Sequence, residues 1–415
     1  MTIEHAPLSA RPTIFVPDRA GPVGHYGTQE RLQILSDSAL QYAKREIQSW
    51  PGYATTPLVP LQALATAARV SGIYYKDEGG RFGLGSFKAL GGAYAVMRLL
   101  QSVILDRTGE AASAADIAEG RFAAVCGALT VTCATDGNHG RSVAWGARIF
   151  GCRCVIYVHA TVSQARCDAI AHYGAEVRRM PGNYDDAVRQ AAADADLEGW
   201  HVVSDTSYPG YVDVPRNVMQ GYGVMVDEAL SQFPVDVVPT HVFVQGGVGG
   251  LAAAVCATLW ERLGDRKPVM VVVEPDKAAC LFRSAVAGEP VVVHGDLDTI
   301  MAGLACGEVS LLAWEILREG ADGYVMIEDQ AAAETMRLLA RPAAPDIPIV
   351  AGESAVAGLA GFLQVAGHDD LRARLSIDEA SVVLFFGSEG ATDPELYEKI
   401  VGVPPEDVAA LAGAR

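Results

Sequence analysis

The chain alternates short apolar runs with longer alanine-rich segments along most of its 415 residues. The apolar runs are rich in Val, Ile and Cys and end in turn residues, whereas the segments between them place apolar residues at helical spacing. This alternation is typical of parallel strands joined by helices. The predicted strands span residues 72–78, 152–159, 176–181, 200–205, 240–246, 269–275, 324–329 and 381–387. We therefore expect an α/β fold with mostly parallel, twisted sheets covered by helices.

A compact βαβ pattern between residues 120 and 205 interrupts this series. The chain is longer than one typical core requires, so two domains are expected. We predict a large domain formed by residues 1–119 and 206–415 and a smaller inserted α/β domain formed by residues 120–205. Residues 1–50 contain no recognisable chemistry and are expected to cover the large domain or to mediate assembly.

Composition and charge narrow the class of partner. The formal net charge of −18 argues against nucleic acid, which normally binds a basic surface, and against an anionic membrane. The eight cysteines lie mostly in apolar runs without a CxxC pair, so we expect reduced thiols and no metal site. The N-terminal stretch MTIEHAPLSARPTIFVP lacks a basic region followed by an apolar core, so no signal peptide is expected. These features favour a cytoplasmic enzyme that acts on a small molecule.

One lysine stands between a glycine-rich turn and a small-residue helix in GLGSFKALGGAYAV, residues 83–96. A lysine amine in a suitable environment is a nucleophile, and its most frequent covalent use is a Schiff base with a carbonyl compound. Gly83 and Gly85 form the turn and Ser86 can cap the helix, which leaves room beside Lys88. A solvated helix start would explain Lys88 equally well, so its assignment depends on the other motifs.

A second polar turn lies in ATDGNHGRSVAWGA, residues 134–147, between an apolar run and a predicted helix. Backbone N–H groups at such a helix start can hold a carboxylate or a phosphate. An Asx turn before a capped helix would need no ligand. Because Asp136, Asn138 and His139 all fall in this one turn, we favour a functional role.

A third turn lies in VFVQGGVGGLAAAV, residues 242–255, where a strand, a glycine turn and a helix follow one another. Its amides can hold a phosphate. Gly247, Gly249 and Ala252 also satisfy a loose dinucleotide pattern, with Glu274 where a ribose ligand is expected, so an NAD-binding oxidoreductase is an alternative. A dinucleotide site needs neither of the two other turns. An amine, a polar turn and a phosphate loop together indicate pyridoxal 5'-phosphate.

The three turns resemble those of the fold type II, tryptophan-synthase-β-like pyridoxal-phosphate enzymes, in which they occur in this order. Within that group the chain is similar to the diaminopropionate ammonia-lyases over about residues 50 to 400. ATDGNHGR is the most discriminating stretch, because relatives usually have a small residue where Asp136 stands. Val248 and the pair Gly387–Ser388 depart from the family pattern. The other stretches that support the resemblance are SDTSYPGY (204–211), EPDKAACL (274–281), TIMAGLACGE (299–308), GESAVAGL (352–359) and SEGATDPELY (388–397).

This resemblance implies roles for individual residues. Lys88 would form the Schiff base with the cofactor, Asn138 would bond its phenolic oxygen, and Ser388 would place a hydroxyl against its pyridine nitrogen. Asp136 would be a second base or would hold the β-ammonium of the substrate. Asp205 would contact the substrate as an acid, although a helix cap explains it equally well. The phosphate would be bound by Gly246, Gly247, Val248, Gly249 and Gly250, and the substrate carboxylate by the backbone of Thr135, Asp136, Gly137, Asn138 and His139.

The resemblance also implies a reaction, the α,β-elimination of D- and L-2,3-diaminopropionate to pyruvate and ammonia. Another β-eliminating lyase, such as a serine/threonine-type or hydroxy-amino-acid dehydratase, is the nearest alternative. The NAD-binding oxidoreductase and a non-catalytic ligand-binding protein are more distant alternatives. A homodimer is expected from the resemblance alone.

Overall fold

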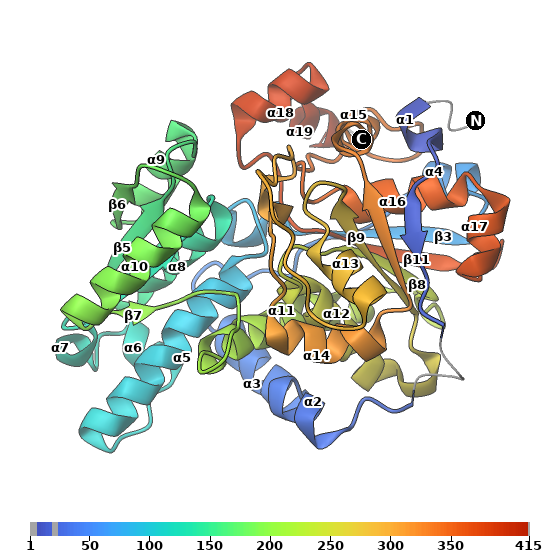
Figure 1. Ribbon diagram of the computed structural model, residues 1–415. Helices are drawn as coiled ribbons and strands as arrows, with labels where there is room; N and C mark the ends of the chain where they lie inside the picture. Colours follow the sequence, from blue (N-terminus) through green and yellow to red (C-terminus); the bar gives the residue numbers. More distant parts are fainter. Residues whose placement is uncertain (1–5, 19–23, 414–415) are drawn as a thin grey trace. The chain divides into compact units, whose positions relative to one another are not determined.

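A computed structural model describes residues 6–18 and 24–413 of the chain (Figure 1). The chain folds into two compact units. The first unit comprises the described residues of Met1–Ser36, Thr55–Gly80 and Met225–Arg415, and the second comprises Asp37–Ala54 and Arg81–Val224. Each unit contains its own sheet with helices packed against it, which confirms the predicted α/β class.

The first unit is built on a seven-stranded sheet with the order β1-β10-β9-β8-β11-β3-β2. The five inner strands are parallel, and the two edge strands pair antiparallel with their neighbours. The inner strands are mostly apolar on both faces, as parallel strands covered by helices require. The strands are β1 (Thr13–Phe15), β2 (Leu58–Pro60), β3 (Gly72–Asp77), β8 (His241–Gln245), β9 (Val269–Pro275), β10 (Gly323–Ile327) and β11 (Val382–Gly387).

Small residues let helix α16 lie against this sheet (Figure 1). A Cβ atom at Gly358 would come within 2.5 Å of the Phe243 carbonyl oxygen, and one at Gly361 within 2.8 Å of the Val273 side chain. Larger residues at these positions would push the helix away from the strands. The helices of this unit are α1 (Ala6–Ser9), α2 (Gln29–Ile34), α4 (Gln62–Ala67), α12 (Gly250–Leu263), α13 (Cys280–Ala287), α14 (Leu311–Gly320), α15 (Asp329–Ala340), α16 (Ala357–Ala366), α17 (Asp369–Arg374), α18 (Pro394–Val401) and α19 (Pro405–Gly413).

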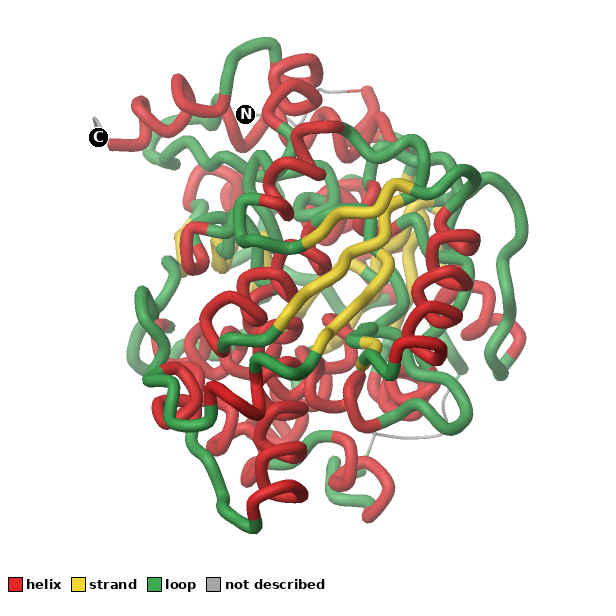
Figure 2. Tube along the Cα trace, turned by 90° about the vertical axis from the view of Figure 1, so that its left-hand side faces the viewer, coloured by secondary structure: helices red, strands yellow, loops and turns green. Residues whose placement is uncertain are grey.

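The second unit is built on a four-stranded, fully parallel sheet with the order β6-β5-β4-β7. Its strands are β4 (Thr130–Ala134), β5 (Arg153–Val158), β6 (Glu176–Arg179) and β7 (His201–Val202). Its helices are α3 (Asp37–Gln48), α5 (Ala89–Thr108), α6 (Ala114–Ala118), α7 (Ala123–Cys126), α8 (Asn138–Phe150), α9 (Gln164–Ala171) and α10 (Tyr184–Glu198). Helix α11 (Asp213–Gln232) leads the chain from this unit back into the first. In Figure 2 the strands are the yellow segments between red helices.

The second unit includes more of the chain than the insert expected at residues 120–205. Helix α5, which precedes that segment, packs tightly against α8 inside it. A Cβ at Gly92 would come within 2.0 Å of the Ser142 hydroxyl, and one at Gly146 within 2.7 Å of the Ala93 Cα. The small residues after Lys88 are therefore needed for helix packing, which places Lys88 in the second unit.

All eight predicted strands are present, with ends shifted by a few residues. The strands β1, β2 and β4 were not predicted. Strand β1 lies in the stretch 1–50, where it extends the first sheet, whereas residues 1–5 and 19–23 of that stretch lie outside the described part. Across residues 6–18 and 24–413, none of the helices combines the length and apolar character needed to cross a bilayer.

Candidate active site

Polar residues gather at the carboxyl ends of the parallel strands of the second unit. Asp136 follows β4, His159 follows β5 and Asp205 follows β7. Because the carboxyl ends of parallel strands share one edge of a sheet, these side chains lie in one region. Ligands of open α/β sheets bind at this edge.

Lys88 joins this group from the start of helix α5. Its Nζ lies 2.7 Å from Oδ2 of Asp205, and the two side chains are 21% and 17% exposed. The same Nζ lies 5.5 Å and 5.9 Å from the ring centroids of Phe87 and Tyr222, within range of cation–π attraction. Lys88 is therefore a half-buried, paired amine and not a solvated helix start. Tyr222 was not predicted as a site residue.

Asp205 carries the negative charge opposite this amine. Burial alone would raise its pKa, but the Lys88 ammonium and the His139 ring together hold the pKa of Asp205 well below its usual range. The residue is therefore an ionised carboxylate while Lys88 is free. The sequence predicted an acid that contacts the substrate, whereas in this state Asp205 is the counter-ion of Lys88.

The imidazole ring of His139 is buried within the second unit. Its Nε2 lies 2.7 Å from the Val203 carbonyl oxygen and its Nδ1 lies 3.8 Å from Asp205. A carbonyl only accepts, so Nε2 bears the proton in this arrangement. Burial lowers the pKa of His139, although the Asp205 charge opposes this shift. The side chain of His139 is held against Val203 and Asp205, which leaves only the backbone of His139 for the predicted substrate cradle.

The turn before helix α8 is held by Thr135. Its buried hydroxyl oxygen accepts hydrogen bonds from the amides of Gly137 and Gly140, each at 3.0 Å. The Gly137 amide, which the sequence assigned to the substrate cradle, is therefore satisfied within the turn. Asn138 is the first residue of α8, so its side chain emerges at the helix start.

Asp136 is paired with a histidine that the sequence analysis missed. Its Oδ1 lies 2.7 Å from Nε2 of His159, and the two side chains are 34% and 18% exposed. Strand pairing accounts for this contact, because Ala134 is the register partner of Tyr157 and each polar residue follows two positions later. The pair becomes visible only once the register of β4 and β5 is known.

The predicted phosphate loop, Gly246–Gly250, joins strand β8 to helix α12 in the first unit. Gly247 and Gly249 have φ angles of +61° and +100°, which favour glycine. Among the described residues, the amides of Gly247, Val248 and Gly250 meet no hydrogen-bond acceptor. A Cβ at Gly249 would come within 2.9 Å of the Ala313 Cβ. Unused amides at a helix start form a site for a phosphate group.

Ser388 follows strand β11 and is buried beside Gln245 in the same unit. Its Oγ accepts a hydrogen bond of 2.7 Å from Nε2 of Gln245, which also donates to the Phe386 carbonyl oxygen at 2.8 Å. The Ser388 hydroxyl proton is therefore directed to another acceptor. A neutral pyridine nitrogen is such an acceptor. Gln245 was not singled out by the sequence.

Glu274 contradicts the dinucleotide alternative. Its two carboxyl oxygens accept hydrogen bonds from the amides of Leu281 and Phe282, at 3.0 Å and 2.6 Å, and so cap helix α13. Burial raises the pKa of Glu274 to about 8, although these two amides oppose the shift. A fully buried cap is not available to a ribose hydroxyl.

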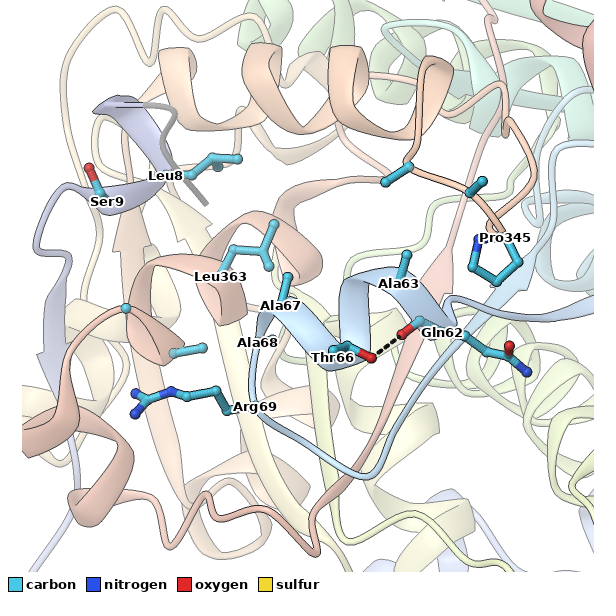
Figure 3. Close-up of a pocket in the computed structure, with 14 residues that line it drawn as sticks. Leu8, Ser9, Gln62, Ala63, Thr66, Ala67, Ala68, Arg69, Pro345 and Leu363 are labelled. Atoms are coloured by element: carbon cyan, nitrogen blue, oxygen red, sulfur yellow. Dashed lines mark hydrogen bonds between the residues drawn. The ribbon is translucent and has the colours of Figure 1, made fainter. Parts of the chain in front are cut away.

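A cavity of about 800 Å³ lies elsewhere in the first unit, beside helix α4 (Figure 3). Most of its lining side chains are small and apolar, and the Thr66 hydroxyl donates to the Gln62 carbonyl oxygen within the helix. The only charged residue among the lining residues, Arg69, is paired with Asp369 at 2.6 Å. This cavity contains none of the predicted site residues.

The residues of the two units match the groups of pyridoxal phosphate. The second unit supplies a primary amine for an aldehyde. The first unit supplies unused amides for a phosphate and a hydroxyl donor for a pyridine nitrogen. Both sets of donors fit this cofactor in their chemistry.

Comparisons with known proteins give the same answer. The model of the family described as pyridoxal-phosphate dependent enzymes matches residues 50–388. Diaminopropionate ammonia-lyase of Escherichia coli strain K12 is 41% identical over 377 residues, covering 90% of this chain and 93% of the relative. The crystal structure of the Escherichia coli enzyme in complex with D-serine superposes with a TM-score of 0.85 at 38% identity, covering 94% of this chain and 97% of that one. The structure with an aminoacrylate-PLP azomethine reaction intermediate gives a TM-score of 0.82 at 38% identity, with the same coverage. The chain therefore belongs to the family of pyridoxal-phosphate-dependent enzymes, in the group of the diaminopropionate ammonia-lyases.

Proposed function

We propose that the chain catalyses the α,β-elimination of 2,3-diaminopropionate to pyruvate and ammonia. The observation that carries this proposal is the likeness to diaminopropionate ammonia-lyase over nine-tenths of the chain. A second observation supports it, because the partly exposed carboxylate of Asp136 at the start of α8 suits a substrate with a β-ammonium group.

Lys88 binds the cofactor in this proposal. Pyridoxal phosphate, when bound, supplies the electron sink that makes the Cα proton of an amino acid acidic. Lys88 would hold the aldehyde of the cofactor, and its amine, when free, would serve as a base on one face of the substrate. Asp205 lies 2.7 Å from this amine and holds it in place. Phe87 and Tyr222 limit the access of water to it.

Asp136 is the second base in this proposal and acts on the opposite face. A single lysine reaches only one face of a planar substrate, so one base alone would limit the enzyme to one enantiomer. A carboxylate on the turn that precedes α8 gives the enzyme a base for the other enantiomer. We therefore assign D- and L-diaminopropionate as substrates. The substrate carboxylate binds the backbone of the turn Thr135–His139, apart from the amides of Thr135 and Gly137, which are already bonded within the protein.

The first unit binds the phosphate and the ring nitrogen of the cofactor. The amides of Gly247, Val248 and Gly250 meet no acceptor among the described residues, which suits them to a phosphate. Gly246 and Gly249 let this loop pack closely against Glu274 and Ala313. The Ser388 hydroxyl would donate to the ring nitrogen and leave it uncharged. Asn138, at the start of α8, would bond the phenolic oxygen.

The enzyme acts as a homodimer in the cytoplasm in this proposal. The resemblance to the family supports the dimer, and the acidic composition argues against nucleic-acid and membrane partners. Sedimentation of the cofactor-loaded protein tests the assembly, and a monomer would contradict it.

The substrate is tested by comparing kcat/KM for pyruvate release from D- and L-diaminopropionate, serine and threonine. We expect diaminopropionate to exceed both hydroxy amino acids, because the relative that matches nine-tenths of this chain is a diaminopropionate ammonia-lyase. A preference for serine or threonine would identify a dehydratase and would leave the cofactor assignment intact. A protein that binds no pyridoxal phosphate would refute the proposal as a whole.

A further inference from the structure

His159 lies beside the proposed second base and is not itself part of the proposed chemistry. Its Nε2 lies within hydrogen-bonding distance of Oδ1 of Asp136, at 2.7 Å, whereas Oδ2 of Asp136 accepts no hydrogen bond from a described residue. With 34% of the side chain exposed, one carboxylate oxygen of Asp136 is held and the other is open.

The sheet of the second unit fixes this arrangement. Strands β4 and β5 are parallel neighbours, with Ala134 opposite Tyr157 at their ends. Asp136 and His159 leave these strands at equivalent positions, so the distance between them is set by the spacing of the sheet and not by a mobile loop. The sheet therefore holds His159 in place to position the side chain of Asp136.

Thr161 holds the other side of the imidazole. Its Oγ1 lies 3.0 Å from Nδ1 of His159. A hydroxyl donates to a neutral Nδ1 and accepts from a protonated one, so both protonation states of His159 keep this hydrogen bond. In both states Nε2 bears a proton, and His159 donates to the Asp136 carboxylate.

Two arginines bond the backbone around this turn. Arg166 of helix α9 donates to the backbone carbonyl of Asp136 at 3.2 Å. Arg179 of strand β6 donates to the carbonyls of Ala160 and Val162, at 3.1 Å and 2.6 Å. The hydrogen bond that the structure shows to the Asp136 carboxylate comes from His159.

We propose that His159, oriented by Thr161, is a positioning residue that holds the Asp136 carboxylate for proton abstraction from the D enantiomer. The inference rests on the proposed function, in which Asp136 is the second base. The hydrogen bond to Oδ1 fixes the rotation of the carboxylate and directs Oδ2 toward the substrate.

The proton transfer that His159 supports is balanced without a further reactant. The Cα–H bond breaks and its proton moves to Oδ2 of Asp136. The electron pair of that bond forms the double bond between Cα and Cβ, and the β-nitrogen leaves with the pair of the broken Cβ–N bond. His159 keeps its Nε2 proton throughout, so its contribution is to geometry and charge.

The test compares the two enantiomers in the same cofactor-loaded protein. In His159→Ala, we expect kcat on D-diaminopropionate to fall by on the order of 10-fold to 10²-fold, because a misplaced base loses alignment. The kcat on the L enantiomer should remain close to that of the wild type. The isotope effect with Cα-deuterated D substrate should rise, since proton removal becomes slower. A purely structural role of His159 would lower kcat on both enantiomers by the same factor.

Three variants complete the test. His159→Gln restores an N–H donor near the Nε2 position and should recover most of the lost activity on the D enantiomer. Thr161→Val keeps the shape but removes the hydrogen bond to Nδ1, and it should also lower the ratio of D to L activity. The control is His172→Ala, which removes an exposed histidine in edge-to-face contact with Tyr173 in the same unit and should change neither rate.

Two results would overturn the inference. One is an unchanged ratio of D to L activity in both His159→Ala and Thr161→Val. The other is an equal loss of kcat on both enantiomers in His159→Ala, with no recovery of kcat in His159→Gln. If His159→Ala fails to bind the cofactor, Thr161→Val and His159→Gln decide the question. If the wild type acts on serine and not on diaminopropionate, the proposed substrate is wrong, and D- and L-serine give the same comparison for His159.

Discussion

Replacing Gly249 by alanine tests the phosphate loop with the smallest possible change. Gly249 has a φ of +100°, a value that costs an L-residue about 1–3 kcal/mol. The new Cβ would lie 2.9 Å from the Ala313 Cβ and 3.3 Å from the side chains of Leu281 and Leu317. Overpacking of this kind costs about 1–3 kcal/mol more, and the backbone must shift to relieve it. Because the neighbours belong to helices α13 and α14, the shift falls on the loop.

The two costs together have a lower end of about 2 kcal/mol. If this amount is lost from the free energy of cofactor binding, the Kd for pyridoxal phosphate rises roughly thirtyfold. The assay is titration of the cofactor-free protein with pyridoxal phosphate, followed by the visible absorbance of the bound form. Gly402→Ala is the matched control, because Gly402 has a φ of +83° at the end of α18 and open space around its Cβ position. We expect Gly402→Ala to reduce stability by about 1–2 kcal/mol and to leave the Kd unchanged. An unchanged Kd in Gly249→Ala would show that the loop does not hold the phosphate.

Three further predictions concern Asp136, Asp205 and Gln245. Asp136→Asn should lower kcat on D-diaminopropionate by about 10²–10⁴-fold and spare the L enantiomer, and equal losses in steady-state assays would instead indicate a role in binding. In the cofactor-free protein, the lowered pKa of Asp205 stabilises the fold above about pH 4 and this contribution disappears as the pH falls further. The stability advantage of the wild type over Asp205→Asn in urea unfolding should therefore shrink from neutral to acidic pH, and a growing advantage would refute the ion pair. Gln245→Leu should lower kcat about tenfold with the cofactor retained, because Ser388 loses the donor that orients it, and an unchanged kcat would refute this orientation.

The sequence predicted the three turns because each combines glycine or polar residues with the end of an apolar run. Local pattern alone places Lys88 before a helix, Asp136 before another and Gly247 after a strand. The α/β class follows from the same alternation, since strand and helix periodicities are properties of neighbouring residues. These predictions needed no knowledge of distant contacts.

The missed features depend on which distant segments meet. His159 becomes visible as a partner of Asp136 only when the register of β4 and β5 is known. Gln245 reaches Ser388 through the pairing of β8 and β11, which are far apart in the sequence. Glu274 has the spacing of a ribose ligand, and only the fold of α13 reveals it as a buried cap.

The extent of the second unit also could not be predicted from the local sequence pattern. The expected boundary at residue 120 follows from the start of a new βαβ series. Helix α5 precedes that boundary and still belongs to the second unit, because Gly92 and Gly146 allow α5 and α8 to touch. Two glycines on separate helices indicate close packing only once the helices are known to cross.

The position of the cofactor-binding amine is the most direct test of the account. Borohydride reduction of the cofactor-loaded protein, followed by peptide mapping, should recover the pyridoxyl group on Lys88. Lys76 is the internal comparison, because it is fully buried and its Nζ donates to the Thr56 carbonyl, Glu228 and Gln232 at 2.7, 2.8 and 2.8 Å. An amine held by three acceptors is not available to an aldehyde, so the peptide that contains Lys76 should stay unlabelled. Recovery of the label on Lys76 or on any lysine other than Lys88 would contradict the site described for the second unit.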